Sequence, residues 1–599
     1  MSEEIWERKV PPMPEDPDVV VIGSGLAGLT AAAYLAANDQ RVLVLEQYDV
    51  AGGCSQTFRR KNKWQFDVGL HYIGGVKTGE IARILQGIGL HERIEFPELD
   101  PDGFDTFVFP DLEFKVPKGW DNYVGRLVET FPEEEEGLRG VTDVMRNLMD
   151  ELREVGIPDS NTDLAEYVEK APTVVSWGMR SVNELFEEHY LSERSRAVLI
   201  GQAGDYATPP SRTPVILHAG LVDHYLQEGA FYVRGGGQEL AGHLVDLIHS
   251  YGGRVRTHAE VEHIATASTE DGGHRVTGVE LKGGEVIDTG NVIATGDIKH
   301  LFLDLLDSEA VPEGIREQVK AYRMATPLFT VYLGLDFDIT ERMPATNYWL
   351  HSRYDQEAYY DPIAAGEFDT DPPVYISSAS AKDPGHEGHA PEGCSTVELM
   401  TWATPDPEAW GVDESEDAPK YSRQAAYREA KDRLTEQLID RAEDQLGEIR
   451  SHILWKEAAT PMTQTRYTLS TGGSSYGIEL ATDQFGPLRL EYRGPGPWRS
   501  LEPPRSRHRR GDERRGGIRL GRPRPEPPGR GRRRRGLRRA GHPHLGRRRL
   551  GRPRSLPQAP GQGPPRLTGR SSLLARGAFQ SLARAALAAS SPERRAPSM

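Results

Sequence analysis

Three glycines and one glutamate near the start of the chain have the spacing of a dinucleotide-binding turn. Gly23, Gly25 and Gly28 form the pattern Gly-x-Gly-x-x-Gly, and Glu46 follows 18 positions after the last of them. In such a turn the first glycine permits a tight bend, the second lets the backbone approach a pyrophosphate, and the third lets a helix pack closely on a strand. An acid at this distance can accept hydrogen bonds from a ribose hydroxyl. The four residues therefore predict a site for FAD or NAD rather than NADP.

The elements that would position these residues lie on both sides of the turn. The β-branched run at 19–22 predicts a buried strand, the alanine-rich stretch at 29–39 predicts a helix, and the apolar run at 42–45 predicts a second strand. The positive end of the helix would face the phosphates. A glycine-rich turn without a nucleotide is the alternative. The presence of the strand, turn, helix, second strand and acid together favours the nucleotide site.

A second glycine pair and a longer motif follow the acid. Residues 52–58 read GGCSQTF, and residues 66–75 read FDVGLHYIGG. Here the sequence resembles the FAD-dependent family of phytoene desaturases, carotenoid isomerases and retinol saturases, and most closely its saturase branch. Gln56 stands where members of that family often have histidine. Further similar stretches, such as FYVRGGG at 231–237, extend the resemblance over most of residues 18–489.

The resemblance implies an α/β fold, in which a Rossmann-like FAD-binding domain of the amine-oxidase-like type is interleaved with an α+β substrate domain. We expect residues 15–77, 231–300 and 455–490 to form the FAD-binding domain, and residues 78–230 and 301–454 to form the substrate domain. Val261 would lie beside the adenine through its backbone. The residues expected to bind FAD are Gly23, Ser24, Gly25, Ala27, Gly28, Glu46, Gln47, Gly52, Gly53 and Val261.

The resemblance also implies an enzyme that saturates, desaturates or isomerises C=C bonds of a carotenoid- or retinoid-like isoprenoid, by hydride transfer at flavin N5 and with NAD(P)H as a candidate reductant. Because such a substrate has no polar group at its reacting carbons, we expect an apolar tunnel and assign no catalytic residue. Two other classes stay open: a prenyl-lipid binding module of the GDP-dissociation-inhibitor type, and an amine-oxidase-like flavoenzyme. The intact glycine pattern and Glu46 favour an enzyme over the binding module.

Several histidines have both a chemical and a structural interpretation. His71 could donate a proton beside the flavin, because reduction of a C=C bond needs a proton as well as a hydride. A hydrogen-bonded structural histidine is the alternative. His386, His389 and Glu387 could bind a metal, but their glycine- and proline-rich setting and their place in the family favour a plain loop. We therefore expect no metal site.

The composition disfavours several other classes. Cys54 and Cys394 are the only cysteines, so neither a disulfide framework nor a cysteine-based metal cage is expected, and a reducing compartment is favoured. The acidic start lacks the apolar core of a signal peptide, and no apolar run approaches the roughly 20 residues of a membrane span. We expect a cytoplasmic protein without a transmembrane segment, with peripheral membrane contact to collect an apolar substrate.

The net charge of −18 is the sum of two unlike parts. Residues 491–599 hold 29 arginines, no lysine and six acidic residues, whereas residues 1–490 carry a balance of −41. A disordered tail that binds an anionic partner is one interpretation. The missing lysines and scarce aromatic residues favour another, in which GC-rich coding DNA is translated in a shifted frame from near residue 490. The last FAD motif of the family would then be missing, and FAD binding would be impaired. The acidic part argues against a nucleic-acid partner.

We predict that resequencing the gene near codon 490 will reveal a single-nucleotide frame slip. With permissible codons for residues 505–515, a reading one nucleotide later contains Gly-His-Gly-Ile-Ala-Gly, which resembles the motif that the family carries here. The corrected product should yield peptides with this motif in mass spectrometry. An unbroken reading frame, together with peptides from residues 491–599 of the protein as written, would contradict the prediction.

Overall fold

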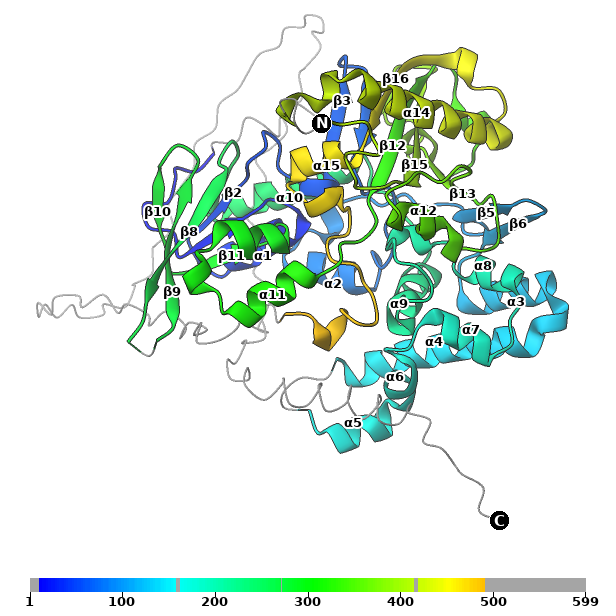
Figure 1. The fold of residues 1–599 in the computed structure, drawn as a ribbon, viewed down its shortest axis with the longest axis horizontal. Helices are drawn as coiled ribbons and strands as arrows, with labels where there is room; N and C mark the ends of the chain where they lie inside the picture. The colour runs from blue at the N-terminus through cyan, green and yellow to red at the C-terminus, as the bar shows by residue number, and fades with distance from the viewer. Residues whose placement is uncertain (1–9, 158–161, 271, 414–417, 491–599) are drawn as a thin grey trace, which may run out of the picture. The chain divides into compact units, whose positions relative to one another are not determined.

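The computed structural model describes residues 10–157, 162–270, 272–413 and 418–490 (Figure 1). The chain divides into two units, one of residues 1–499 with 572–599 and one of residues 500–571. All of the described residues belong to the first unit. The arginine-rich segment 491–599, including its predicted disorder and frame slip, lies outside the described residues.

A four-stranded parallel sheet forms around the predicted nucleotide turn. Its strand order is β11-β1-β2-β7, and the strands are β1 (Val19–Ile22), β2 (Val42–Leu45), β7 (Arg254–Arg256) and β11 (Val292–Ala294). β1 and β2 are almost wholly buried, as expected for strands covered on both faces. The predicted order of strand, glycine turn, helix and strand is confirmed, because α1 (Leu26–Ala37) connects β1 to β2.

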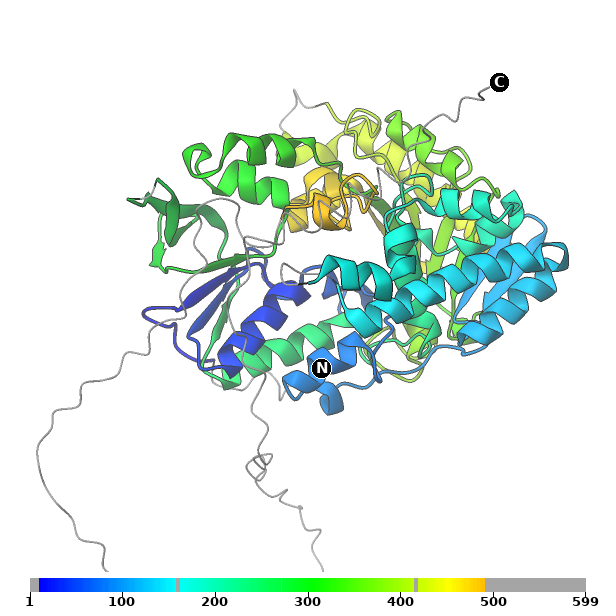
Figure 2. The same cartoon turned by 90° about the horizontal axis from the view of Figure 1, so that it is seen from below.

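Different elements cover the two faces of this sheet. On one face α1 packs beside α10 (Gly237–Ser250), and the two helices run side by side in Figure 2. On the other face an antiparallel sheet of order β10-β9-β8 contributes Ile264 and Val279 to a cluster with Val20 and Leu43. The strands of this smaller sheet are β8 (Val261–Ser268), β9 (His274–Leu281) and β10 (Val286–Asp288).

A larger, seven-stranded sheet has the order β16-β12-β15-β14-β13-β5-β6. Its strands are β5 (Asp105–Phe109), β6 (Leu112–Val116), β12 (Leu328–Leu335), β13 (Asn347–Leu350), β14 (Val374–Ser377), β15 (Ser395–Trp402) and β16 (Ile453–Ala459). Because side chains alternate along a strand, Val331 and Leu399 point to one face, where they pack with α14 (Ala425–Leu446). Trp349 and Met400 point to the opposite face.

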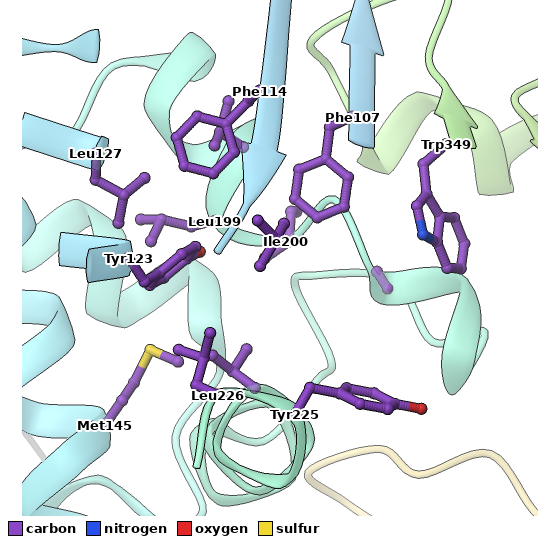
Figure 3. Close-up of a cluster of buried hydrophobic side chains, with 14 of the residues drawn as sticks. Phe107, Phe114, Tyr123, Leu127, Met145, Leu199, Ile200, Tyr225, Leu226 and Trp349 are labelled. Carbon is purple, nitrogen blue, oxygen red and sulfur yellow. The ribbon is translucent and has the colours of Figure 1, made fainter. Parts of the chain in front are cut away.

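Helices cover that opposite face near β5 and β6. They are α3 (Trp120–Thr130), α4 (Glu135–Val155) and α9 (Val215–Leu226). Figure 3 shows Phe107 and Phe114 of the two strands above Tyr123, Met145 and Leu226 of the three helices. The shared core joins the strands and helices of the predicted segment 78–230.

Shorter elements complete the described part of the chain. The hairpin of β3 (Thr57–Arg60) and β4 (Trp64–Asp67) follows the second glycine pair. The remaining helices are α2 (Glu80–Gly87), α5 (Leu164–Lys170), α6 (Pro172–Trp177), α7 (Val182–Glu188), α8 (Glu193–Leu199), α11 (Glu313–Ala321), α12 (Tyr360–Ala364), α13 (Ala379–Lys382) and α15 (Pro461–Thr468). Of the helices in these residues, none combines the length and the apolar composition needed to cross a lipid bilayer.

One strand departs from the expected domain layout. Residues 455–490 are expected in the FAD-binding domain, but β16 pairs with β12 over Thr330–Leu335, in the seven-stranded sheet. The local sequence pattern of a strand does not indicate a pairing partner more than 100 residues away. Periodicity therefore cannot predict the domain boundary near residue 455. The rest of the proposed domain division stays a prediction.

We predict that Trp410→Ala will lower the free energy of unfolding by about 3–5 kcal/mol, because the change leaves a cavity in a closely packed core. Trp410 is completely buried, packs against Phe329 and Phe368, and donates from Nε1 to the Thr404 carbonyl over 2.9 Å. Chemical denaturation monitored by circular dichroism would measure the loss. Tyr251→Ala, at a half-exposed site, is the control and should change stability by about 0.5 kcal/mol or less. Equal effects of the two changes would contradict the prediction.

Candidate functional site

The first glycine turn leaves an open, uncapped helix N-terminus. Gly23 has φ of 96°, and a Cβ on Gly28 would lie 2.2 Å from the Gly23 carbonyl oxygen. A Cβ on Gly25 would meet no atom within 4 Å. Since no side chain caps the start of α1 at Leu26, its first backbone N–H groups face this open space. Gly25 therefore provides a cradle of the kind that a pyrophosphate occupies.

Glu46 lies at the mouth of the same turn. Its Oε2 accepts hydrogen bonds from the Ser24 backbone N–H at 3.0 Å and from the Ser24 hydroxyl at 2.6 Å, and its Oε1 accepts one from the N–H of Tyr48 at 2.9 Å. The Ala259 N–H donates to the Glu46 carbonyl oxygen at 2.8 Å. Val261 follows two residues later and is buried in the cluster on this side of the sheet. The acid and Val261 are thus brought together from positions more than 200 residues apart.

The second glycine pair packs directly on the first turn. Gly52 donates to the Ser24 carbonyl oxygen at 3.0 Å and forms a bridge with Gly25. A Cβ on Gly53 would lie 2.9 Å from the Gly25 Cα. Ala27 is exposed on the first turn of α1, whereas the Gln47 side chain donates to the Tyr467 carbonyl oxygen at 3.2 Å.

These residues fit FAD. The uncapped N-terminus supplies N–H donors and positive potential for the phosphates, and Glu46 supplies a ribose acceptor. The structure brings the predicted set together around one turn, with Val261 on the adjoining strand and Gln47 directed toward α15. As individual FAD contacts these residues stay proposals.

A cavity of about 380 Å³ opens between the cofactor motifs and the seven-stranded sheet. Cys54, Gly69 and His71 line one side, and they come from the GGCSQTF and FDVGLHYIGG motifs. Tyr225 of α9 and Tyr476 line further walls. The floor is a row of paired residues that crosses five strands: Trp349, Tyr375, Met400, Thr330 and Ala459.

A second row of paired residues lies two positions further along the strands, on the same face, and it is polar. It comprises Asp105 and Asn347, and then Ser377, Glu398 and Tyr332. Buried polar groups are costly unless they have partners. Residues 67–72, which lead from the cofactor hairpin into the cavity wall, supply several of these partners.

Lys382 is the buried cation of this region. Its ammonium group donates to the His71 carbonyl oxygen at 3.0 Å and to the Ser377 hydroxyl at 2.7 Å. Burial lowers the pKa of Lys382 to about 8, although the negative charge of Glu398 opposes the shift. The Lys382 side chain therefore fixes the position of the His71 backbone.

Tyr72 connects two buried carboxyl groups. Its hydroxyl lies 2.6 Å from Asp205 Oδ2 and 3.2 Å from Asp105 Oδ2. Gln202 also donates to that Asp105 oxygen at 2.6 Å. Burial, and then the charge of Asp105, raises the pKa of Asp205 to about 8. Since one hydroxyl hydrogen cannot serve both acids, a protonated Asp205 at the cavity wall completes the arrangement.

His71, Glu398 and Asp67 form a third group. His71 Nδ1 lies 3.0 Å from Glu398 Oε2. Both atoms are buried, and neither has a hydrogen-bond partner of good geometry in the described part of the chain. The other Glu398 oxygen accepts from the Asp67 N–H at 3.0 Å. Burial raises the pKa of Glu398, whereas His71 acts to lower it.

The ligand atoms of this trio are close enough to hold a metal ion. However, Asp67 already accepts hydrogen bonds from the Tyr232 hydroxyl and from the Gly237 N–H. Since both Asp67 oxygens accept hydrogen bonds, we interpret the trio as a buried polar cluster and assign no metal to it.

The other histidine group suggested by the sequence lies in a loop. His389 is buried, with Nε2 3.3 Å from Asp383 Oδ2, and Asp383 also accepts from the Gly235 N–H at 2.9 Å. Glu387 is exposed. The loop therefore packs on the glycine-rich segment near Gly235, and its three residues do not converge on one point.

Sequence reasoning missed Lys382, Glu398 and Asp205. One signal was present: Glu398 is the single charged residue of β15, whose sequence is STVELMTW and whose residues are all buried. Because burying a charge without a partner is costly, a charged residue in such a strand predicts a buried polar partner elsewhere in the chain. Lys382 and Asp205 carry no comparable local signal.

The comparisons with known proteins agree with this geometry. The family model described as flavin containing amine oxidoreductase matches residues 26–417. The chain belongs to this family, and it is an FAD-dependent oxidoreductase, as its sequence predicts.

Individual proteins to which the chain is similar include two enzymes and one solved structure. All-trans-retinol 13,14-reductase of Danio rerio is 27% identical, over 79% of this chain and 79% of the relative. Prolycopene isomerase 1 of an Oncidium hybrid cultivar is 24% identical, over 77% and 75%. Among solved structures, a putrescine oxidase triple mutant shares the fold, with a TM-score of 0.50 at 14% identity over 78% of this chain and 88% of that one.

We predict that Gly25→Ala and Gly28→Ala will separate cofactor binding from folding. Gly25→Ala should leave the thermal unfolding of the apoprotein unchanged and weaken FAD binding, because its methyl group enters only the open cradle. Gly28→Ala should lower the unfolding temperature as well, because its Cβ clashes with Gly23 backbone. Circular dichroism and FAD titration measure the two effects.

Gly242→Ala is the matched control, because a Cβ there also meets no atom within 4 Å and α10 needs no glycine at that position. It should retain both stability and FAD affinity. Wild-type FAD affinity in Gly25→Ala would contradict the assignment of the cradle.

Proposed function

We propose that the protein saturates, desaturates or isomerises C=C bonds of an apolar, retinoid- or carotenoid-like isoprenoid. The observation that carries the proposal is the cavity, whose aromatic and aliphatic floor faces the FDVGLHYIGG motif. By their names, relatives of this chain act on all-trans-retinol and on prolycopene. A volume of about 380 Å³ lies at the lower end of the roughly 300–1,000 Å³ range of ligand cavities, which favours a retinoid-sized substrate.

In this proposal the first glycine turn, the pair Gly52 and Gly53, Glu46 and the backbone of Val261 hold the FAD. When bound, the flavin supplies or accepts the hydride at N5. The chain orients the polyene between the aromatic floor and the motif wall, and excludes water from the reacting carbons. NAD(P)H is the proposed reductant in the saturating direction.

The proposed setting follows from the substrate. An isoprenoid partitions into bilayers, so we propose a cytoplasmic enzyme that collects its substrate by peripheral contact with a membrane. The acidic balance of residues 1–490 argues against a nucleic-acid partner. A non-catalytic prenyl-lipid binding module and an oxidase of amines are the alternatives that the test must separate.

We predict that the protein with its reading frame restored, loaded with FAD, will reduce all-trans-retinol under anaerobic conditions with NADPH or dithionite, yielding a product heavier by two hydrogens, or will isomerise prolycopene. Visible spectra and mass-resolved chromatography measure flavin and product. A colourless protein that still binds the isoprenoid would support the binding module, and peroxide formation with putrescine would support an amine oxidase.

Met400→Trp tests whether the cavity is the substrate site. Met400 is buried in the cavity floor, so a larger side chain should weaken retinol binding about tenfold, or about 1.4 kcal/mol. Val286→Trp, at an exposed position of β10, is the control and should bind retinol as the wild type does. Unchanged retinol affinity in Met400→Trp would place the substrate elsewhere.

A further inference from the structure

The cavity wall contains one histidine whose backbone and ring are both held by buried charged groups. His71 lines the cavity, and the Lys382 ammonium group binds its carbonyl oxygen at 3.0 Å. Its ring Nδ1 faces Glu398 Oε2 at 3.0 Å. Because Nδ1 lies beside the carboxyl group in the sheet, we assign Nε2 as the nitrogen that faces the cavity.

The other cavity histidines are arranged differently. The Nε2 of His224 accepts a hydrogen bond from the Gly74 N–H at 2.9 Å, so that nitrogen carries no proton to donate. The Nε2 of His351 lies 3.3 Å from the Gly201 carbonyl oxygen. Neither has a carboxylate at its second nitrogen among the described contacts. His71 alone among these three combines a cavity position with a buried carboxyl partner.

We propose that His71 is the catalytic proton donor of the C=C reduction, with Glu398 and Lys382 as its positioning residues. This inference rests on the proposed function, because it supplies the proton that must accompany the hydride. It also extends that function, since it names the residue that supplies this proton.

The proton transfer balances within the pair. In the proposed step the ring of His71 carries two protons, one on Nε2 and one on Nδ1 beside the Glu398 carboxylate. The Nε2–H bond breaks, its electron pair stays in the ring, and the proton joins the substrate carbon, whose electron pair forms the new C–H bond. The second proton stays on Nδ1, so a neutral imidazole faces a carboxylate. In the desaturating direction the same nitrogen accepts the proton.

The surroundings support this arrangement. The buried Lys382 lies close enough to Glu398 for the two charges to interact. Its positive charge stabilises the Glu398 carboxylate that remains after the proton transfer. The neighbouring Tyr72 is held by Asp205 and Asp105, so the chain on both sides of the His71 ring is fixed. The floor beside His71 is mainly aromatic and aliphatic, so a polyene can pack against it next to the ring.

The test compares His71→Gln, Glu398→Gln and wild type, each as the full chain loaded with FAD. After reduction by dithionite, reoxidation of the flavin by all-trans-retinol should slow about 100-fold in His71→Gln, the lower range of general acid catalysis. Glu398→Gln should show an intermediate loss. Retinol affinity, from quenching of tryptophan fluorescence, should stay within about twofold of wild type in both. Added imidazole should restore part of the rate in His71→Ala.

His452→Gln is the matched control. His452 also places Nδ1 near a carboxylate, at 2.7 Å from Asp336, but on the surface and away from the cavity. It should reoxidise at the wild-type rate. A loss in this variant equal to that in His71→Gln would overturn the proposal.

A second readout does not depend on turnover. The proton shared by His71 and Glu398 should give a strongly downfield resonance in NMR spectra of ¹⁵N-histidine-labelled apoprotein, which Glu398→Gln removes and His452→Gln retains. Its absence from the wild type would overturn the arrangement without affecting the proposed function. A wild type that reacts with retinol while His71→Gln reacts equally fast would overturn the donor alone. A wild type that reacts with no polyene would overturn the proposed function, and the donor with it.

Discussion

The arrangement of the site depends on one set of interactions. Buried polar side chains of the seven-stranded sheet contact residues 67–72, the segment that follows the cofactor hairpin. Glu398 and Asp105 belong to strands of the seven-stranded sheet, and each would be costly to bury without a partner. The backbone of Asp67, the ring of His71 and the hydroxyl of Tyr72 supply these partners. This pairing fixes the FDVGLHYIGG segment against the sheet, and so places the cavity beside the predicted flavin site.

The same constraint explains the chemistry of the wall. Burial raises the pKa of carboxyl groups such as Asp205 and lowers that of Lys382. Two residues further along the strands the row consists of Trp349, Tyr375 and Met400, with Thr330 at its β12 position. One sheet face therefore carries a mainly aromatic and aliphatic row of side chains and, next to it, a row of buried polar and acidic side chains. This combination suits a substrate that is apolar throughout but must gain or lose a proton.

The cofactor side of the molecule follows a simpler rule. Its parts are glycines that allow close approach, a helix start without a cap, and one acid. Each of these is a local property of the chain, and the sheet only has to bring Ala259 and Val261 beside Glu46.

The sequence alone determined the strand, glycine turn, helix and second strand from Val19 to Leu45 and the acid at Glu46, because these depend on spacing within about 30 residues. It also predicted the flavoprotein family, through the resemblance carried by GGCSQTF, FDVGLHYIGG and further stretches up to residue 489. It suggested His71 as a proton donor but could not choose between that role and a structural one. Only the tertiary structure decided that Glu398 and Lys382, more than 300 positions away, face His71, and that β16 joins the seven-stranded sheet. Strand pairing over such distances is selected by the burial of whole faces, and a local pattern does not record which partner satisfies a buried charge.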